Sequence, residues 1–349
     1  MMARRDLIIG LVILAVAIAL PFTGMSRYFV SQITLLFIWA TVVTQWNLVL
    51  GVAGIFSLAQ MAIFAFGGYS TAMIGLYLEW NLWAAMPISA AVSVIVGLLI
   101  GLACLRLTGA YVALLTLSIS VALFVLIVTD TDCIRYEGAV CRSLTEGWRG
   151  LGRFGDFGFR DWLGGRDYLK GNYYLALVLL AIATAGSILV VRSRVGLAFK
   201  ALRDNRLYAA SRGVSRFKYQ LLVFAYSAFF TGLAGSVYAG NFTVIGPNIL
   251  QLPLLLLLLS MLVIGGSGTI WGPLAGSVLL MVIDEILKEG IIQEYRTLIL
   301  GVLLALFVMY LPGGVVGTLE VGLARLLQRW RSWSGSSAGN LDGGGEGRA

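Results

Sequence analysis

Four polar side chains stand inside long apolar runs in the first fifth of the chain: Gln45, Asn47, Ser57 and Gln60. A buried amide or hydroxyl is unfavourable unless it faces a polar cavity or forms a hydrogen bond with a neighbouring helix. These residues therefore either line a path for a polar substrate or join helices, an interaction worth about 0.6 kcal/mol on average in membranes. Helix joining is the better interpretation for the hydroxyl. The amides of Asn47 and Gln60, with four bonding groups each to satisfy, favour the substrate path.

Residues that would support catalysis or metal binding are nearly absent from the sequence. It contains no histidine, which removes histidine metal sites, histidine general bases and Ser-His triads. The three cysteines form no CxxC pair, so we expect no metal site. Cys133 and Cys141 lie in a polar segment and could form a disulfide in an oxidising compartment. A membrane enzyme would depend on Asp284 and Glu285, which we interpret instead as solvated acids near a helix end.

The composition places these residues in an integral membrane protein. Apolar residues make up 59% of the chain, charged residues only 12%, and the mean hydropathy is +0.90. A soluble domain carries about twice that share of charged residues. We predict an all-α polytopic membrane protein with about ten transmembrane helices, within a range of eight to ten. The predicted spans are 7–25, 28–49, 51–78, 82–105, 110–129, 173–191, 219–240, 250–265, 270–287 and 298–311.

The charges of the loops predict which side of the membrane each loop faces. Segment 193–217 carries six basic residues and one acidic residue, so we place it in the cytoplasm. Segment 130–171 carries seven of each sign, so we place it outside. Basic residues put the N-terminus and the C-terminal tail in the cytoplasm, and ten spans satisfy all four assignments. This topology accounts for the net charge of +8, so we expect no nucleic acid partner.

Glycines interrupt one span in each half of the chain. The first group is Gly51, Gly54, Gly67 and Gly68, and the second is Gly265, Gly266, Gly268, Gly272 and Gly276. The two groups would enter the membrane from opposite sides, so we predict an inverted-topology repeat, which is common in transporters. Close helix packing is the alternative explanation.

The domain division and the energy source follow from the same patterns. Residues 1–317 are interpreted as a transmembrane permease domain, and 318–349 as a cytoplasmic tail that ends in a disordered Ser-Gly-Asn-rich stretch. An ion-coupled secondary transporter would be expected to keep a buried acid inside its spans. The spans hold almost no ionisable residues, so we expect the energy for transport to come from elsewhere.

The basic segment 193–217 has the pattern of two short helices. An amphipathic helix is expected over 194–203, and a second helix over 206–212, capped by Asp204 and Asn205 and ended by Gly213. The residues expected to share one apolar side of the first helix are Leu197, Ala198, Ala201 and Leu202. Such a pair either offers a docking surface to a cytoplasmic partner or is an ordinary basic loop that only fixes the topology.

Several stretches resemble the branched-chain amino acid ABC transporter permeases of the LivM type. They are GLAFKALRDNRLYAASRGVSRFKYQLLVFAYSAFFTGLAGSVYA, NLVLGVAGIFSLAQMAIFAFGGYSTA, MLVIGGSGTIWGPLAGSVLL, LRLTGAYVALLTLS, TEGWRGL and the closing LPGGVVG. They occur in the family's order and cover residues 47–317. Each motif alone is weak, but together they are a strong signal.

The resemblance implies a multi-pass subunit of an ATP-driven importer in the cytoplasmic (inner) membrane of a bacterium or archaeon. Its partners would be a second related permease, two cytoplasmic ATPase subunits that use ATP and Mg, and an extracytoplasmic substrate-binding protein. This chain would bind no cofactor and would not be an enzyme. The expected cargo is a branched-chain or other hydrophobic amino acid, moved by alternating access, with urea, amides or other small polar nutrients as the alternative.

The resemblance also implies a coupling loop that docks on the ATPase subunits. It would comprise Gly196, Ala198, Leu202, Arg203, Asn205, Ala209, Gly213 and Val214. The guanidinium of Arg203 would pair with an acidic rim of the ATPase, and the small Ala209 would allow close contact. The chain departs from the family pattern at Arg206, where an acid is usual, and at Tyr208 and Arg212. It also carries Ala59-Gln60 in place of a Gly-His pair, so the path has no titratable group there.

Overall fold

The computed structural model describes residues 2–130, 132, 135–137, 140–287, 296–310 and 314–318. The apolar segments are helical because a backbone without access to water must satisfy its own hydrogen bonds. The helices are α1 (Met2–Ala19), α2 (Arg27–Asn47), α3 (Gln60–Tyr77), α4 (Leu82–Cys104), α5 (Ala110–Val128), α6 (Phe159–Arg192), α7 (Arg194–Asp204), α8 (Arg206–Ser211), α9 (Arg216–Phe242), α10 (Leu252–Gly265), α11 (Gly272–Leu287) and α12 (Arg296–Tyr310). The strands are β1 (Arg135–Glu137), β2 (Val140–Arg142), β3 (Leu151–Gly152) and β4 (Val244–Ile245).

Five helical segments of the described chain are long and apolar enough to cross a membrane. They are Arg27–Val52, Leu82–Cys104, Ala110–Val128, Asp167–Arg192 and Arg216–Phe242. Shorter apolar helices cover Gly10–Phe22 and Leu252–Gly265. The chain is therefore an all-α membrane protein, as predicted. The count of ten spans and the inverted repeat stay predictions, because several predicted spans coincide with shorter helices.

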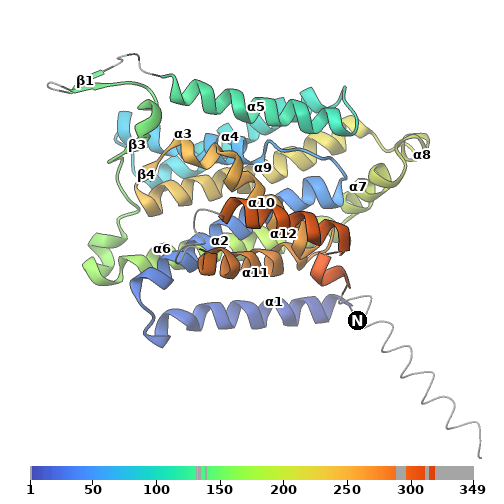
Figure 1. Ribbon diagram of the computed structural model, residues 1–349, viewed down its shortest axis with the longest axis horizontal. Helices are drawn as coiled ribbons and strands as arrows, with labels where there is room; N and C mark the ends of the chain where they lie inside the picture. The colour runs from blue at the N-terminus through green and yellow to red at the C-terminus, as the bar shows by residue number, and fades with distance from the viewer. Residues whose placement is uncertain are drawn as a thin grey trace, which may run out of the picture.

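The long helices run side by side, from α5 along one edge of the bundle to α1 along the other (Figure 1). α9 packs along α3 and α4, and α2 packs along α6. Glycine permits the closest contact, because a methyl group on Gly67 of α3 would overlap the backbone of Gly232 on α9. The hydroxyl of Thr71 lies 2.8 Å from that of Ser89 and 2.7 Å from that of Ser236, which joins α3, α4 and α9.

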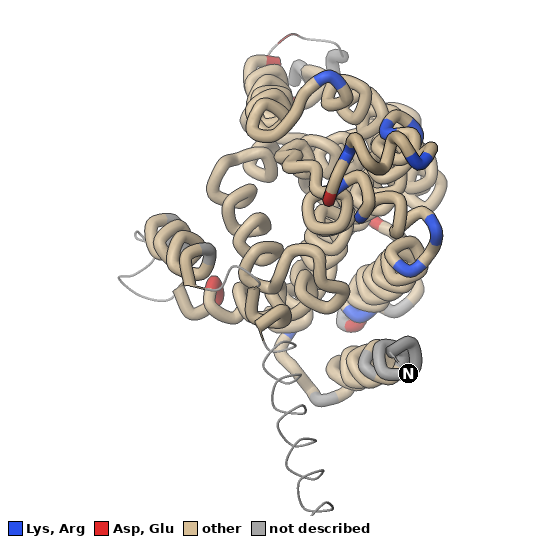
Figure 2. Tube along the Cα trace, turned by 90° about the vertical axis from the view of Figure 1, so that its right-hand side faces the viewer, with Lys and Arg blue, Asp and Glu red and all other residues tan. Residues whose placement is uncertain are grey.

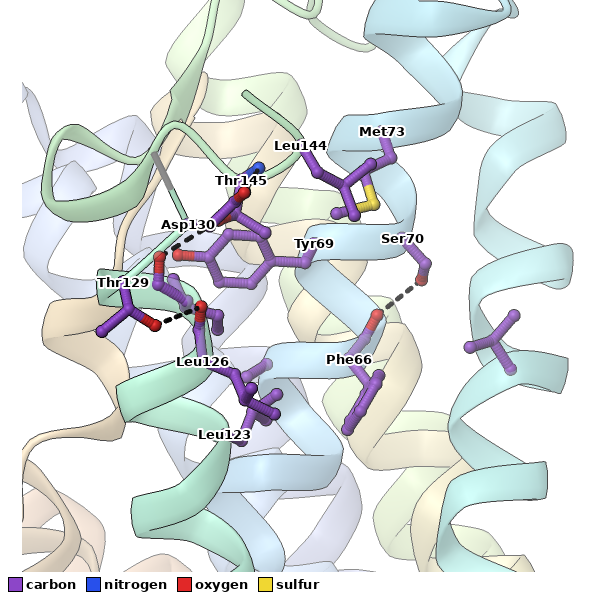
Figure 3. A pocket seen from close by; sticks show the side chains of 13 residues that line it. Phe66, Tyr69, Ser70, Met73, Leu123, Leu126, Thr129, Asp130, Leu144 and Thr145 are labelled. Atoms are coloured by element: carbon purple, nitrogen blue, oxygen red, sulfur yellow. Dashed lines mark hydrogen bonds between the residues drawn. The ribbon is translucent and has the colours of Figure 1, made fainter. Parts of the chain in front are cut away.

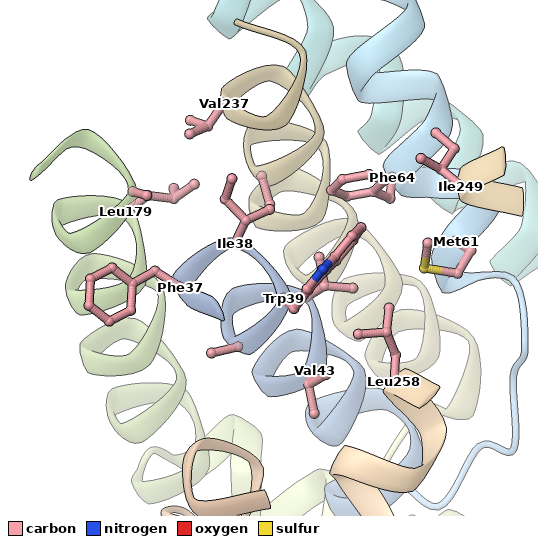
Figure 4. Close-up of a cluster of buried hydrophobic side chains, with 14 of the residues drawn as sticks. Phe37, Ile38, Trp39, Val43, Met61, Phe64, Leu179, Val237, Ile249 and Leu258 are labelled. Atoms are coloured by element: carbon pink, nitrogen blue, oxygen red, sulfur yellow. The ribbon is translucent and has the colours of Figure 1, made fainter. Parts of the chain in front are cut away.

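Large aromatic side chains fill the core between these helices. The rings of Trp39 on α2 and Phe64 on α3 have centroids 5.1 Å apart, and Tyr238 of α9 lies 5.6 Å from Trp39. Figure 4 shows Trp39 and Phe64 side by side, with Leu258 of α10 nearby. Aromatic pairs at this separation add to the free energy gained by burying their area.

One end of the bundle carries the short strands, and the other carries α7, α8 and the start of α1 (Figure 1). Viewed from the second end, basic residues gather around α7 and α8 (Figure 2). We call these the outer end and the cytoplasmic end, following the prediction from loop charge. At the outer end β3 pairs with β4 in antiparallel register, with Leu151 opposite Ile245 and Gly152 opposite Val244.

The structure corrects two predicted boundaries. The expected loop 130–171 is partly helical, because α6 begins at Phe159 and is kinked at Gly164, whose φ of 77° and ψ of 163° are not helical. The expected span 51–78 is broken. α2 continues through a π-helical turn, Leu48–Val52, after which the chain is not helical until α3 begins at Gln60. The apolar residues between these points hid the break from a count of hydrophobic positions.

Two predictions concern residues outside the described part. Cys133 lies there, so its disulfide with Cys141 stays a prediction, as does the tail, of which only Thr318 is described. Cys104, the third cysteine, is a buried free thiol.

Candidate functional site

The segment that joins α6 to α9 folds as the predicted pair of short helices. The Ser193 hydroxyl caps α7 by accepting from the Val195 amide at 3.2 Å, and the Asn205 side chain caps α8 by accepting from the Tyr208 amide at 3.0 Å. α8 ends just before Gly213, which adopts a φ of 82°. Local capping signals therefore fixed the form of this segment.

Four of the eight predicted coupling residues are covered by this chain itself. Gly196, Ala198, Leu202 and Ala209 are all buried. Phe199, which sequence analysis did not select, is 1% exposed and packs edge-on against Tyr219 of α9. Ala209 is 2% exposed within this chain, and its close contact with an ATPase groove stays a prediction. Asn205 and Gly213 are exposed and Val214 is half-buried.

A different set of residues on α7 and α8 faces solvent. Leu197, Leu207 and Tyr208 are 65%, 86% and 61% exposed, and Lys200 and Ala201 lie with them at the surface. The prediction that Leu197 and Ala201 share the apolar side with Ala198 and Leu202 is wrong, because the side covered by the membrane domain is centred on Ala198 and Phe199. We call Leu197, Lys200, Ala201, Leu207 and Tyr208 the outward face. Three large apolar side chains are thus exposed on this short segment.

Arg203 connects α7 to the break after α2. Its Nη1 donates a hydrogen bond to the carbonyl of Gly51, in the π-helical turn. A helix C-terminus has carbonyl groups without partners and a partial negative charge, so a guanidinium is favourable there. The Arg203 side chain also lies close to the backbone that follows this turn, since a methyl group on Gly54 would lie 2.6 Å from Arg203 Cγ. Arg203 is otherwise exposed, and its pairing with an acidic rim of the ATPase stays a prediction.

Asn47 ties the same break to the break between α10 and α11. Its Oδ1 accepts from the Gly268 amide at 2.7 Å, and its Nδ2 donates to the Thr269 carbonyl at 2.8 Å. Gly51 completes the contact, because a methyl group there would overlap both Asn47 Oδ1 and the Gly268 amide. We call Asn47, Gly51, Arg203, Gly268 and Thr269 the break junction. The two glycine-interrupted segments thus meet each other and the coupling loop at one point.

Of the other predicted path residues, Gln45 and Gln60 join helices. Gln45 Nε2 donates to Ser187 Oγ of α6 at 3.1 Å, while its Oε1 is buried with no partner among the described residues. Gln60 Nε2 donates to Ser227 Oγ of α9 at 3.0 Å and to the Thr231 hydroxyl. Gln45, Asn47, Ser57 and Gln60 are 0%, 5%, 3% and 3% exposed.

Ser57 contributes its backbone, whose carbonyl accepts from Trp46 Nε1 at 2.7 Å. The Ser57 hydroxyl accepts from the Ala59 amide at 3.4 Å, within its own segment. The two glutamine amides thus make helix contacts in this conformation, and the substrate path stays a prediction.

The acidic pair on α11 differs from its expected solvated state. Asp284 is 2% exposed and is the one charged side chain among the buried residues that the structure describes. Glu285 accepts a hydrogen bond from the Tyr28 hydroxyl of α2. The solvation expected for Asp284 is wrong, because α2 and α10 pack against α11.

Comparison with known proteins gives a consistent family relationship. The family model described as "branched-chain amino acid transport system / permease component" matches residues 28–308. The permease protein LivM of the high-affinity branched-chain amino acid transport system of Salmonella typhimurium is 28% identical over 318 residues, covering 87% of this chain and 73% of LivM. LivM of Escherichia coli is 27% identical with the same coverage. The permease protein LivH of Salmonella typhimurium is 26% identical over 84% of this chain and 97% of LivH. No solved structure gives a significant match.

Proposed function

Since this chain belongs to the family of permease components of branched-chain amino acid transport systems, we propose that it is the membrane subunit of an ATP-driven importer for branched-chain or other hydrophobic amino acids. The chain is a transport subunit of an inner membrane system rather than an enzyme. The similarity to both LivM and LivH supports pairing with a second permease. Two ATPase subunits and an external binding protein complete the proposed complex.

The observation that carries this proposal is the helix pair α7–α8. Its inner side is anchored by buried small residues and Phe199, while Leu207 and Tyr208 are directed away from the membrane domain. An exposed apolar surface on a helix pair that is packed firmly against the membrane domain suits a cytoplasmic partner that transmits force to that domain. A loop that served only to fix topology would gain nothing from exposing Leu207 at 86%.

The break junction supports a route for that force. A displacement of α7 would move Arg203, and through the Gly51 carbonyl it would move the turn at the end of α2. Asn47 links that turn to Gly268 and Thr269, between α10 and α11. Interrupted helices concentrate such movement because their ends are not held by continuous backbone hydrogen bonds. In the proposed mechanism, ATP hydrolysis in the partners thus reaches both interrupted segments together.

Docking is tested by substitutions on the outward face. Leu207→Asp introduces a charge into an apolar contact, so we expect at least a ten-fold loss of ATPase subunit that copurifies with the permease in detergent. Val244→Asp is the matched control, because Val244 is an exposed valine at the outer end. Equal recovery of the ATPase with both variants would show that the outward face is not the docking surface.

A further inference from the structure

A cavity of about 570 Å³ lies at the outer end between α3, α4 and α5, and it is open to the surface beside the exposed Leu126 and Leu144. Its volume falls within the range of about 300–1,000 Å³ typical of small-molecule sites. Apolar side chains form most of the wall, among them Phe66 and Met73 of α3, Val92 of α4 and Leu126 of α5. Figure 3 shows Phe66 and Met73 on the same helix as Tyr69, with Leu123 and Leu126 facing them from α5.

The cavity has one polar end, where the outer segment crosses it. Tyr69 is 5% exposed, and its hydroxyl has no hydrogen-bond partner among the described residues. In Figure 3 the Tyr69 ring points toward the end formed by Asp130 and Thr145. A buried hydroxyl without a partner is unfavourable, and such groups in native structures call for a specific explanation. Here the hydroxyl faces a space that a ligand can occupy.

Asp130 is held in place at this end by its neighbour. One carboxylate oxygen, Oδ2, accepts from the Thr145 amide at 2.6 Å and from the Thr145 hydroxyl at 2.7 Å. Both of these bonds use Oδ2, and no bond from a described residue reaches Oδ1, which is left to face a cation. The described residues that line the cavity include this one carboxylate and no basic side chain. The site therefore suits a ligand with an ammonium group and an apolar body.

We propose that this cavity is an outward-facing subsite for the amino acid that the permease imports. The inference rests on the proposed function and adds the residues that hold the substrate. Asp130 pairs with the substrate ammonium, and the Tyr69 hydroxyl donates to the substrate carboxylate. Phe66, Met73 and Leu126 surround the apolar side chain. The absence of a lining cation in the described chain disfavours acidic amino acids, and the apolar wall disfavours basic ones.

Two other occupants fit the polar end less well. A lipid acyl chain offers no partner to the Tyr69 hydroxyl or to Asp130. An apolar helix of the second permease would bury both groups without satisfying them, which is unfavourable. A zwitterion satisfies both at once.

The test uses the complete transporter, with permease pair, ATPase subunits and binding protein, reconstituted in proteoliposomes. Asp130→Asn keeps an acceptor for Thr145 but removes the charge, and Tyr69→Phe removes only the hydroxyl. We expect leucine uptake to fall at least ten-fold with Asp130→Asn and about three-fold with Tyr69→Phe. Asp161→Asn and Tyr111→Phe are matched controls at exposed positions outside the cavity, and we expect both to keep wild-type uptake.

A binding measurement separates this subsite from a purely structural role. Tritiated leucine is added to the transporter in nanodiscs without the binding protein. We expect saturable binding that isoleucine and leucine amide displace and that 4-methyl-2-oxopentanoate, which lacks the ammonium group, does not displace. Both variants should lose this binding while still copurifying with their partners. Unchanged binding would place the substrate elsewhere, and loss of the second permease from the complex would identify the cavity as a packing surface. A wild-type transporter that imports no hydrophobic amino acid would instead contradict the proposed function.

Discussion

At the cytoplasmic end, Asn47, Gly51 and Gly268 pack so closely that one methyl group on Gly51 would overlap both neighbours, whereas at the outer end a cavity of about 570 Å³ opens between α3, α4 and α5. The polar groups follow the same division. Both functional groups of the Asn47 amide are bonded, while the Tyr69 hydroxyl has no partner in the described chain. Close packing transmits displacement, and open space admits a ligand. In the proposed mechanism, the closely packed end transfers force and the open end contacts the substrate.

The largest effect is expected from filling the break junction. Gly51→Ala forces apart Asn47 and the Gly268 backbone, and overpacking at a site formed by backbone atoms should destabilise the fold by about 3 kcal/mol or more. We expect a marked fall in the thermal unfolding temperature measured in detergent, with loss of uptake. Gly301→Ala on α12 is the control, because nothing lies within 4 Å of the added methyl group. A fully stable Gly51→Ala variant would show that the junction is not closely packed.

Removing the Asn47 amide, which joins the two breaks, should reduce the stability of the fold by less than Gly51→Ala does. Asn47→Ala leaves the Gly268 amide and the Thr269 carbonyl without their partner, and an unsatisfied buried group costs about 1–3 kcal/mol. We expect a lower unfolding temperature than wild type but a higher one than Gly51→Ala. Asn81→Ala removes an exposed helix cap on α4 and provides the comparison. If the two asparagine variants behave alike, the amide acts as an ordinary cap rather than as a link.

Arg203→Ala should change coupling more than stability. The ATPase subunits should still bind, because the outward face is intact, but movement of α7 would no longer reach the Gly51 carbonyl. We expect several-fold more ATP hydrolysed for each leucine imported into proteoliposomes. Arg194→Ala, at an exposed position on the same helix, should leave this ratio unchanged. If Arg203→Ala loses the copurified ATPase, Arg203 is part of the docking surface.

The smallest effect is expected midway between the two ends. Thr71→Val removes the hydroxyl shared with Ser89 and Ser236 among α3, α4 and α9. Interhelical hydrogen bonds in membranes average about 0.6 kcal/mol, so the unfolding temperature should fall only slightly. Thr108→Val, at an exposed loop position before α5, is the control. A fall in the unfolding temperature as large as that of Asn47→Ala would mean that this contact stabilises the fold as strongly as the break junction does.

Local signals in the sequence predicted local structure well. The helix pair α7–α8 followed from Asn205 and Gly213, because capping and helix ending depend on neighbours in the chain. The membrane class followed from the scarcity of charge. The side of α7 that is buried did not follow, since Phe199 is covered by Tyr219, and which side of a short helix is covered depends on distant elements.

Contacts between distant segments account for the other differences. Arg203 is exposed, as expected for a surface charge, but its contact with Gly51 has no signal in the sequence, because Gly51 lies 152 residues away and contributes only a carbonyl. Tyr69 is absent from the predicted site residues, because the space beside it is formed by α5 and the outer segment, which lie far from α3 in the sequence. A tyrosine inside an apolar run gives no sign of whether its hydroxyl has a partner.

The pairing of β3 with β4 sets an order for biosynthesis. β3 emerges from the ribosome before α6 through α9 are made, yet its partner strand follows α9, so Leu151 must wait for Ile245. In the predicted topology, the outer segment is exported first and remains without this partner until α9 has been inserted. Closure of the outer end is therefore a late event in folding, and the long-range pairing reports that the helices between the two strands have been threaded correctly.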